Sequence, residues 1–90
     1  MASYRLVIKR SVAKEIESID RKKTRQRVVE RIQELASNPR PYGCEKLSGK
    51  HPYYRIRQGQ FRILYEIRDQ ELIVFVVKVA DRRDVDDRLT

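Results

Sequence analysis

Apolar and basic side chains alternate most regularly across residues 53–67. The alternation has the period of two that a β-strand produces, because successive side chains point to opposite faces of a sheet. Gly59-Gln60 interrupts it, and glycine at the first loop position is typical of a type II′ turn. The pattern predicts a β-hairpin whose core-facing side carries Tyr54, Ile56, Phe61, Ile63, Tyr65 and Ile67.

The predicted turn also fixes which residues of the hairpin face each other. A two-residue loop pairs Gln58 with Phe61, Arg57 with Arg62, Ile56 with Ile63 and Tyr54 with Tyr65. Arg55, Arg57 and Arg62 then share the face away from the core. Like charges directly across a ladder destabilise it, so this arginine cluster indicates an anionic ligand, with a phosphate as the leading candidate.

The rest of the chain supplies the other elements of one small fold. The pattern predicts a strand at 4–9, a helix N-capped by Ser11, a second helix at about 24–37, a loop at 39–49 and an almost continuously apolar strand at 72–80. The β-α-α-β-β-β order predicts a single α+β domain over residues 1–90. In it a helical hairpin packs on one face of a mainly antiparallel four-stranded sheet, followed by a short C-terminal tail or helix.

Charge and composition narrow the choice of partner. The 90 residues include 21 Lys and Arg against 13 Asp and Glu, a net charge of +8. Such an excess favours nucleic acid first, and also a membrane surface or an acidic protein, although a solvated basic surface gives the same count. The N-terminus lacks a signal-peptide pattern, and no apolar run approaches the ~20 residues of a membrane span. We therefore expect a cytoplasmic protein that does not associate with membranes.

Several kinds of catalytic site are disfavoured by the residues present. The chain has no Gly-rich phosphate loop and no metal-ligand spacing, so neither a metal nor another cofactor is expected. A single cysteine, Cys44, excludes an internal disulfide, and with His51 it cannot build a zinc site. A Cys/His nucleophilic pair would lack an orienting partner.

Arginine is then the residue type that could form a catalytic or binding site. If the last strand pairs with residues 61–67, Arg82 comes close to Arg57 and Arg62. Clustered guanidinium groups can stabilise the charge of a phosphodiester transition state. RNA carries its own nucleophile in the 2′-hydroxyl, so such a site could be a metal-free ribonuclease. Equally, the arginines could only hold a polyanion or an acidic partner.

Four stretches resemble the RelE family of bacterial and archaeal toxins. They are Tyr54-Arg-Ile-Arg57, Phe61-Arg-Ile-Leu-Tyr65, the Leu47-Ser-Gly loop, and the run from Val76 to Val85. The resemblance implies a microbial-ribonuclease-like fold and a toxin that cleaves mRNA in the ribosomal A site. It also implies metal-free 2′-hydroxyl attack and neutralisation by an acidic antitoxin. Contact with operator DNA would be indirect, through that antitoxin.

The resemblance also assigns roles to individual residues. Arg55 and Arg57 occupy two basic positions that are lysines in the best-studied pattern, Arg62 matches a phosphate-stabilising arginine, and Arg82 matches the arginine after the last strand. Arg55, Arg62 and Arg82 are thus the catalytic candidates. The expected RNA contacts come from Arg57, Arg83, Lys46 and Lys50.

Two departures from the family pattern keep other functions open. An arginine at position 55 is a poor general base. The C-terminal tyrosine of many relatives is replaced by Asp86. The alternatives are a ParE-like toxin that poisons DNA gyrase through protein contacts, and a catalytically decayed toxin that only binds its antitoxin.

Overall fold

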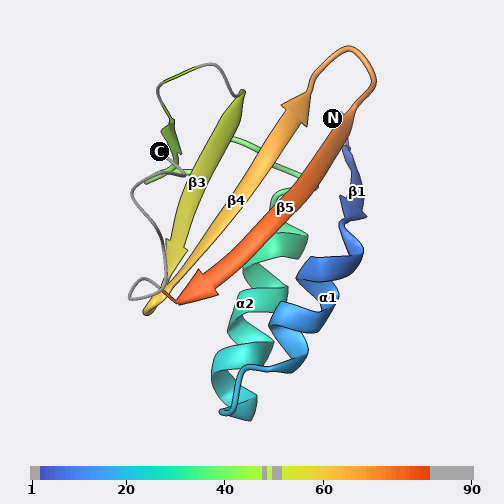
Figure 1. Cartoon of the computed structure of the whole chain (residues 1–90). Coiled ribbons are helices and arrows are strands. Elements are labelled where there is room, and N and C mark those ends of the chain that lie inside the picture. Colours follow the sequence, from blue (N-terminus) through green and yellow to red (C-terminus); the bar gives the residue numbers. More distant parts are fainter. Residues whose placement is uncertain (1–2, 48, 50–51, 82–90) are drawn as a thin grey trace.

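The computed structural model describes residues 3–47, 49 and 52–81. Within these ranges the chain forms two helices and a five-stranded sheet (Figure 1). In chain order the elements are β1 (Arg5–Ile8), α1 (Arg10–Glu17), α2 (Lys22–Glu34), β2 (Glu45–Lys46), β3 (Tyr53–Gln58), β4 (Phe61–Arg68) and β5 (Ile73–Asp81). Neither of the described helices has the length and apolar character needed to span a membrane.

The sheet has the strand order β1-β5-β4-β3-β2. β1 pairs with β5 in parallel, and the other neighbours are antiparallel. α1 and α2 both pack on one face of this sheet (Figure 1). The α+β prediction is confirmed, including the inner position of the apolar strand β5. The sheet gains one strand over the prediction, the two-residue β2.

The hydrophobic core lies between the helices and the sheet. Each helix is short, so its stability comes mainly from the apolar stripe that it buries. The fully or nearly fully buried side chains include Val12, Val28, Ile32 and Leu35 from the helical layer, and Ile56, Ile63, Tyr65, Val74 and Val76 from the strands. Tyr65 satisfies its buried hydroxyl by donating to the Pro39 carbonyl at 2.7 Å.

The predicted hairpin register is confirmed pair by pair. Arg57 lies opposite Arg62, and Tyr54 lies opposite Tyr65. Gly59 has φ +60°, the left-handed conformation that the first position of a type II′ turn requires. The alternation of apolar and basic residues therefore divides the two sides of β3 and β4 as expected.

Three local predictions were wrong. α1 begins at Arg10 after Lys9, so Ser11 is not its N-cap. The Lys9 amide donates to the Val76 carbonyl, which continues the strand pairing up to the first residue of the helix. α2 begins at Lys22. It ends at Glu34 because the next three amides donate to carbonyls three residues back, which is a 3₁₀ pattern. The loop at 39–49 contains β2.

A β-bulge interrupts the pairing of β4 with β5 at Leu64/Tyr65. On the part of β5 that follows this bulge, the Glu15 carboxylate of α1 accepts the Val79 amide at 3.0 Å and pairs with Lys78 at 2.8 Å. The first helix is thereby fastened to β5.

Candidate anion-binding site

The arginine cluster, Arg55, Arg57 and Arg62, lies on the sheet face away from the helices. The register places Arg57 directly opposite Arg62, next to the Gly59 turn, and Arg55 two residues before Arg57 on the same side of β3. Their neighbours in sequence, Ile56 and Ile63, point into the core. The structure therefore brings together three of the predicted site residues.

Arg55 is neutralised by a residue that the sequence reasoning missed. β2 places Glu45 directly opposite Arg55, and the Glu45 Oε2 atom lies 2.6 Å from the Arg55 Nη2 atom. The Arg55 side chain is 12% exposed, whereas that of Glu45 is 58% exposed. A two-residue strand has no periodicity to detect, so the sequence carried no signal for this ion pair.

Arg57 and Arg62 have no such neutralising partner among the residues that the structure describes. Arg57 is exposed and Arg62 is half-buried. The Arg62 Nε atom is buried and finds no hydrogen-bond acceptor in the described part of the chain. An unsatisfied buried donor costs about 1–3 kcal/mol. We call Arg57 and Arg62 the arginine pair, and it forms the uncompensated positive part of the cluster.

Lys46 does not join the cluster. It lies opposite Tyr54, which packs against the hydrophobic core, so the register assigns Lys46 to the helix side of the sheet. Lys50, Arg82 and Arg83 are outside the described residues, as are His51 and Asp86. The roles assigned to all of these residues stay predictions.

A hollow of about 710 Å³ opens on the helix side of the hairpin tip. It lies between the α1–α2 turn and the ends of β4 and β5, where Gln60 donates to the Asp81 carboxylate at 2.8 Å. Its lining includes charges of both signs, among them Asp20, Arg21 and Lys78. This mixture does not continue the purely basic character of the arginine pair.

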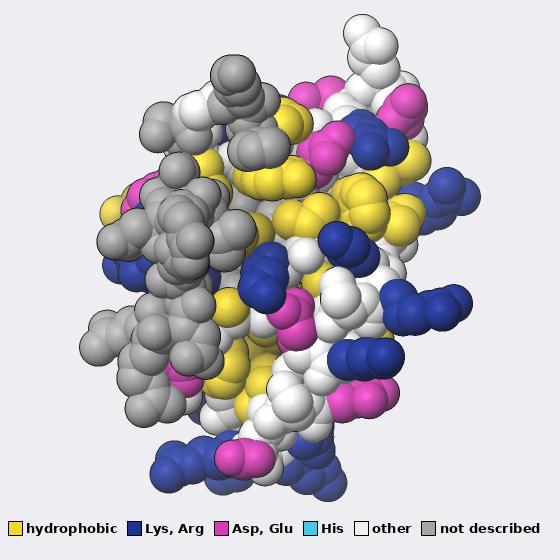
Figure 2. Space-filling model, viewed as in Figure 1, with side chains coloured by type: hydrophobic (Ala, Val, Ile, Leu, Met, Phe, Trp, Pro, Cys, Tyr) yellow, Lys and Arg dark blue, Asp and Glu magenta, His cyan; other side chains and the backbone are white. Residues whose placement is uncertain are grey.

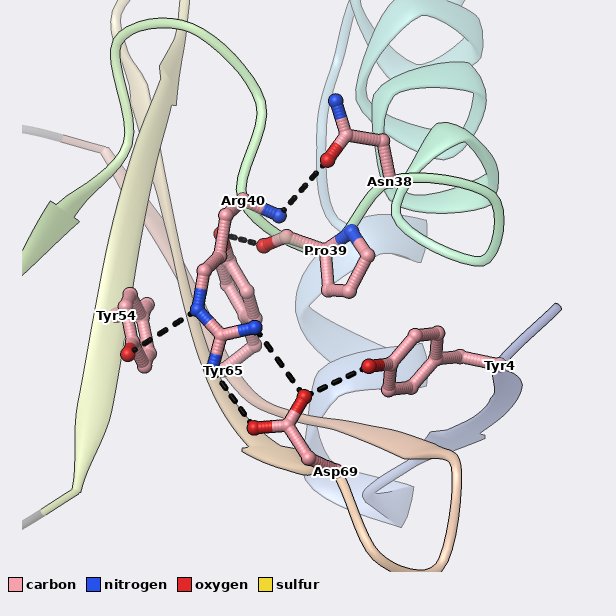
Figure 3. Close-up of polar contacts among 7 residues, drawn as sticks. All are labelled: Tyr4, Asn38, Pro39, Arg40, Tyr54, Tyr65 and Asp69. Atoms are coloured by element: carbon pink, nitrogen blue, oxygen red, sulfur yellow. Dashed lines mark hydrogen bonds and ion pairs between the residues drawn. The ribbon is translucent and has the colours of Figure 1, made fainter. Parts of the chain in front are cut away.

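A polar network connects several elements at the end of the sheet opposite the Gly59 turn (Figure 3). Arg40 donates twice to Asp69, at 2.8 and 3.2 Å, and its guanidinium lies over the Tyr54 ring at 5.4 Å. The Tyr4 hydroxyl donates to Asp69 at 2.6 Å. These hydrogen bonds, those from Arg40 first and that from Tyr4 second, lower the pKa of Asp69 to about 2. The network links the residue that precedes β1, the loop after α2, β3 and the β4–β5 turn, at the end of the sheet opposite the Gly59 turn.

An apolar strip continues the cluster's face of the sheet across β5 and β1. It consists of Val7, Ile73, Phe75 and Val77, which lie outside the helix-side core. Figure 2 shows hydrophobic side chains gathered over β5 and β1, with basic side chains around them. The Arg68 guanidinium lies 5.7 Å from the centroid of the Phe75 ring. One sheet face thus carries an apolar half and a basic half.

The comparison that decides the family covers most of the chain. Residues 6–85 match the family model described as "ParE toxin of type II toxin-antitoxin system, parDE". The chain belongs to the ParE toxin family. Among curated proteins, none matches the sequence significantly. The predicted membership of the wider RelE/ParE superfamily is confirmed, and the protein is a toxin of a toxin–antitoxin system.

Several solved toxin structures have the same fold as this member of the ParE family. The RelE–RelB complex from Pyrococcus horikoshii OT3 is 26% identical, with a TM-score of 0.79, covering 92% of this chain and 99% of that one. The intact RelBE complex from E. coli is 25% identical, with a TM-score of 0.74 and coverage of 88% and 96%. The YoeB/ParE toxin from Agrobacterium tumefaciens, at 19% identity, has a TM-score of 0.70 with coverage of 86% and 96%, and shows the fold alone.

Proposed function

We propose that this toxin is an endoribonuclease that cleaves mRNA, in the ribosomal A site, by attack of the RNA 2′-hydroxyl. The observation that carries the proposal is the arginine pair, two unneutralised cations opposite each other, one with a buried Nε atom that has no acceptor among the described residues. A phosphodiester supplies oxygen acceptors for both guanidinium groups. The site of action would be the cytoplasm, where mRNA is translated.

The reaction requires the protein to align the RNA, to stabilise the developing negative charge and to provide for proton transfer. The nucleophilic 2′-hydroxyl and the phosphorus belong to the same RNA strand. Contacts that hold the RNA backbone therefore also orient the hydroxyl toward the phosphorus. Arg57 and Arg62 would stabilise the negative charge that grows on the phosphate oxygens. Arg82 directly follows Asp81, which lies opposite Phe61, and in this proposal it acts at the same phosphate. Arg83 and Lys50 would add contacts to the RNA.

The test separates mRNA cleavage from other toxic activities. The toxin and Arg62→Ala are induced separately in cells, and mRNA ends are mapped by primer extension alongside growth. Growth arrest with discrete cuts inside translated codons, absent in the variant, is the expected result. Growth arrest with intact messages would contradict the ribonuclease function, and normal growth with intact messages would indicate a toxin that only binds.

A second function is favoured by one specific observation, the match to the ParE family model. A ParE-like toxin would poison DNA gyrase through protein contacts and would need no arginine pair. Induction of a DNA-damage response without mRNA cleavage would support it. Arg62→Ala would then leave toxicity unchanged.

We also propose that an acidic antitoxin docks on the face that carries both the apolar strip and the arginine pair. The E. coli and P. horikoshii relatives were solved with their antitoxins. The toxin's net charge of +8 attracts an acidic partner over long range. An amphipathic segment could place apolar side chains on Phe75 and Val77 and carboxylates on Arg57 and Arg62, which would block access of RNA. Contact with operator DNA would come through the antitoxin.

A further inference from the structure

We propose that Glu45 is the general base of this toxin, an inference that rests on the proposed ribonuclease function. A 2′-hydroxyl must lose its proton as it attacks phosphorus, and guanidinium groups cannot take that proton because they remain protonated in proteins. Of the described carboxylates, Glu45 alone forms an ion pair with the arginine cluster. The structure thus places one proton acceptor among the cations.

The geometry leaves this carboxylate available. In the described part of the chain, Arg55 alone donates to the Glu45 carboxylate, to Oε2 at 2.6 Å, and no residue there donates a hydrogen bond to Oε1. The Glu45 side chain is 58% exposed, so a substrate can reach it. Arg55, which is 12% exposed, is held in place by the sheet and fixes the carboxylate. Its role is therefore that of a positioning residue, with Glu45 as the group that touches the substrate.

The spacing suits a single nucleotide. Glu45 lies opposite Arg55, and Arg57 is two residues farther along β3 on the same face. Diagonal neighbours of this kind are about 7–8 Å apart at their backbones. A phosphate held by Arg57 and Arg62 would direct the ribose attached through its 3′-oxygen toward Glu45. The 2′-hydroxyl of that ribose is the nucleophile.

The step balances without a metal or another reactant. The 2′-hydroxyl transfers its proton to Glu45 Oε1 as a bond forms between O2′ and phosphorus. The bond between phosphorus and O5′ breaks, and the leaving oxygen takes a proton from solvent water. The products are a 2′,3′-cyclic phosphate and a 5′-hydroxyl end. Glu45 then returns its proton to solvent.

The experiment measures single-turnover cleavage of mRNA in a reconstituted translation system with the full chain. Glu45→Gln keeps the shape and a contact with Arg55 but cannot accept the proton, so cleavage should fall by about 10²–10⁴-fold. Glu45→Asp keeps the carboxylate and should retain part of the activity. Glu66→Gln is the matched control, because Glu66 lies on the same sheet face but pairs with Arg68. Binding of each variant to RNA carrying a 2′-O-methyl group at the cleavage site is measured in parallel.

The outcomes separate the role of Glu45 from the ribonuclease function. Loss of cleavage in Glu45→Gln, with wild-type binding of the methylated RNA and wild-type activity of Glu66→Gln, supports the base. Cleavage by Glu45→Gln within about 3-fold of wild type, while Arg62→Ala is inactive, overturns the role of Glu45 and leaves the ribonuclease intact. Equal loss of binding and cleavage in Glu45→Gln also overturns it. No cleavage by the wild type overturns the ribonuclease function and this inference together.

Discussion

Arg57 and Arg62 face each other across β3 and β4 without a neutralising partner in the described part of the chain. Like charges directly opposite in a sheet raise the free energy of the folded state. The neighbouring Arg55 shows the alternative, since Glu45 neutralises it at 2.6 Å. Among the described residues, the fold compensates Arg55 and leaves Arg57 and Arg62 facing each other, which is the arrangement expected of the proposed anion-binding site.

Removing one charge of the arginine pair should therefore stabilise the protein. Arg57→Gln is expected to raise the free energy of unfolding by about 0.2–1 kcal/mol, because it removes the cross-strand repulsion. Urea unfolding of the wild type and the variant checks this. The difference should shrink at about 1 M salt, where exposed charges are screened. A destabilised Arg57→Gln at low salt would show that Arg57 is already compensated.

The Asp69 network should make the free energy of unfolding depend on pH in the acidic range. The pKa of Asp69 is lowered to about 2 in the folded protein, from an ordinary value of 3.8. A lowered carboxyl pKa contributes stability above the unfolded-state value, and that contribution is lost as the pH falls from about 4 through about 2. The wild type should lose stability over this window more steeply than Asp69→Asn. The same slope in urea unfolding of both proteins between pH 5 and 2 would contradict the assigned network.

Antitoxin binding should depend on the apolar strip. Val77→Asp places a negative charge where we expect apolar side chains of an acidic partner, and the affinity for the cognate antitoxin should fall by at least about tenfold, or 1.4 kcal/mol. Gln70→Asp adds the same charge in the exposed β4–β5 turn and serves as the control. Titration calorimetry with the antitoxin measures both. Equal affinities of the two variants would remove the strip from the interface.

The sequence predicts those features whose signals lie within one short stretch of residues. The hairpin register depends on Gly59 and a period of two, both visible in one short stretch, and it was predicted correctly. β2 pairs only Glu45 and Lys46, so it leaves no periodic signal. That pairing decides that Glu45 joins the cluster and that Lys46 lies on the other side. The start of α1 was also missed, because it is set by the contact of Lys9 with β5 rather than by a capping side chain.

The most direct test of the ribonuclease function maps the RNA ends that the purified toxin leaves in a reconstituted translation system. The wild type should cut within translated codons and leave 2′,3′-cyclic phosphate and 5′-hydroxyl ends. Arg57→Ala/Arg62→Ala should leave the message intact, while Arg68→Ala, which removes an arginine from the far end of the same sheet face, should cut normally. Uncut message with all three proteins, each shown to be folded, would contradict the function assigned to the arginine pair.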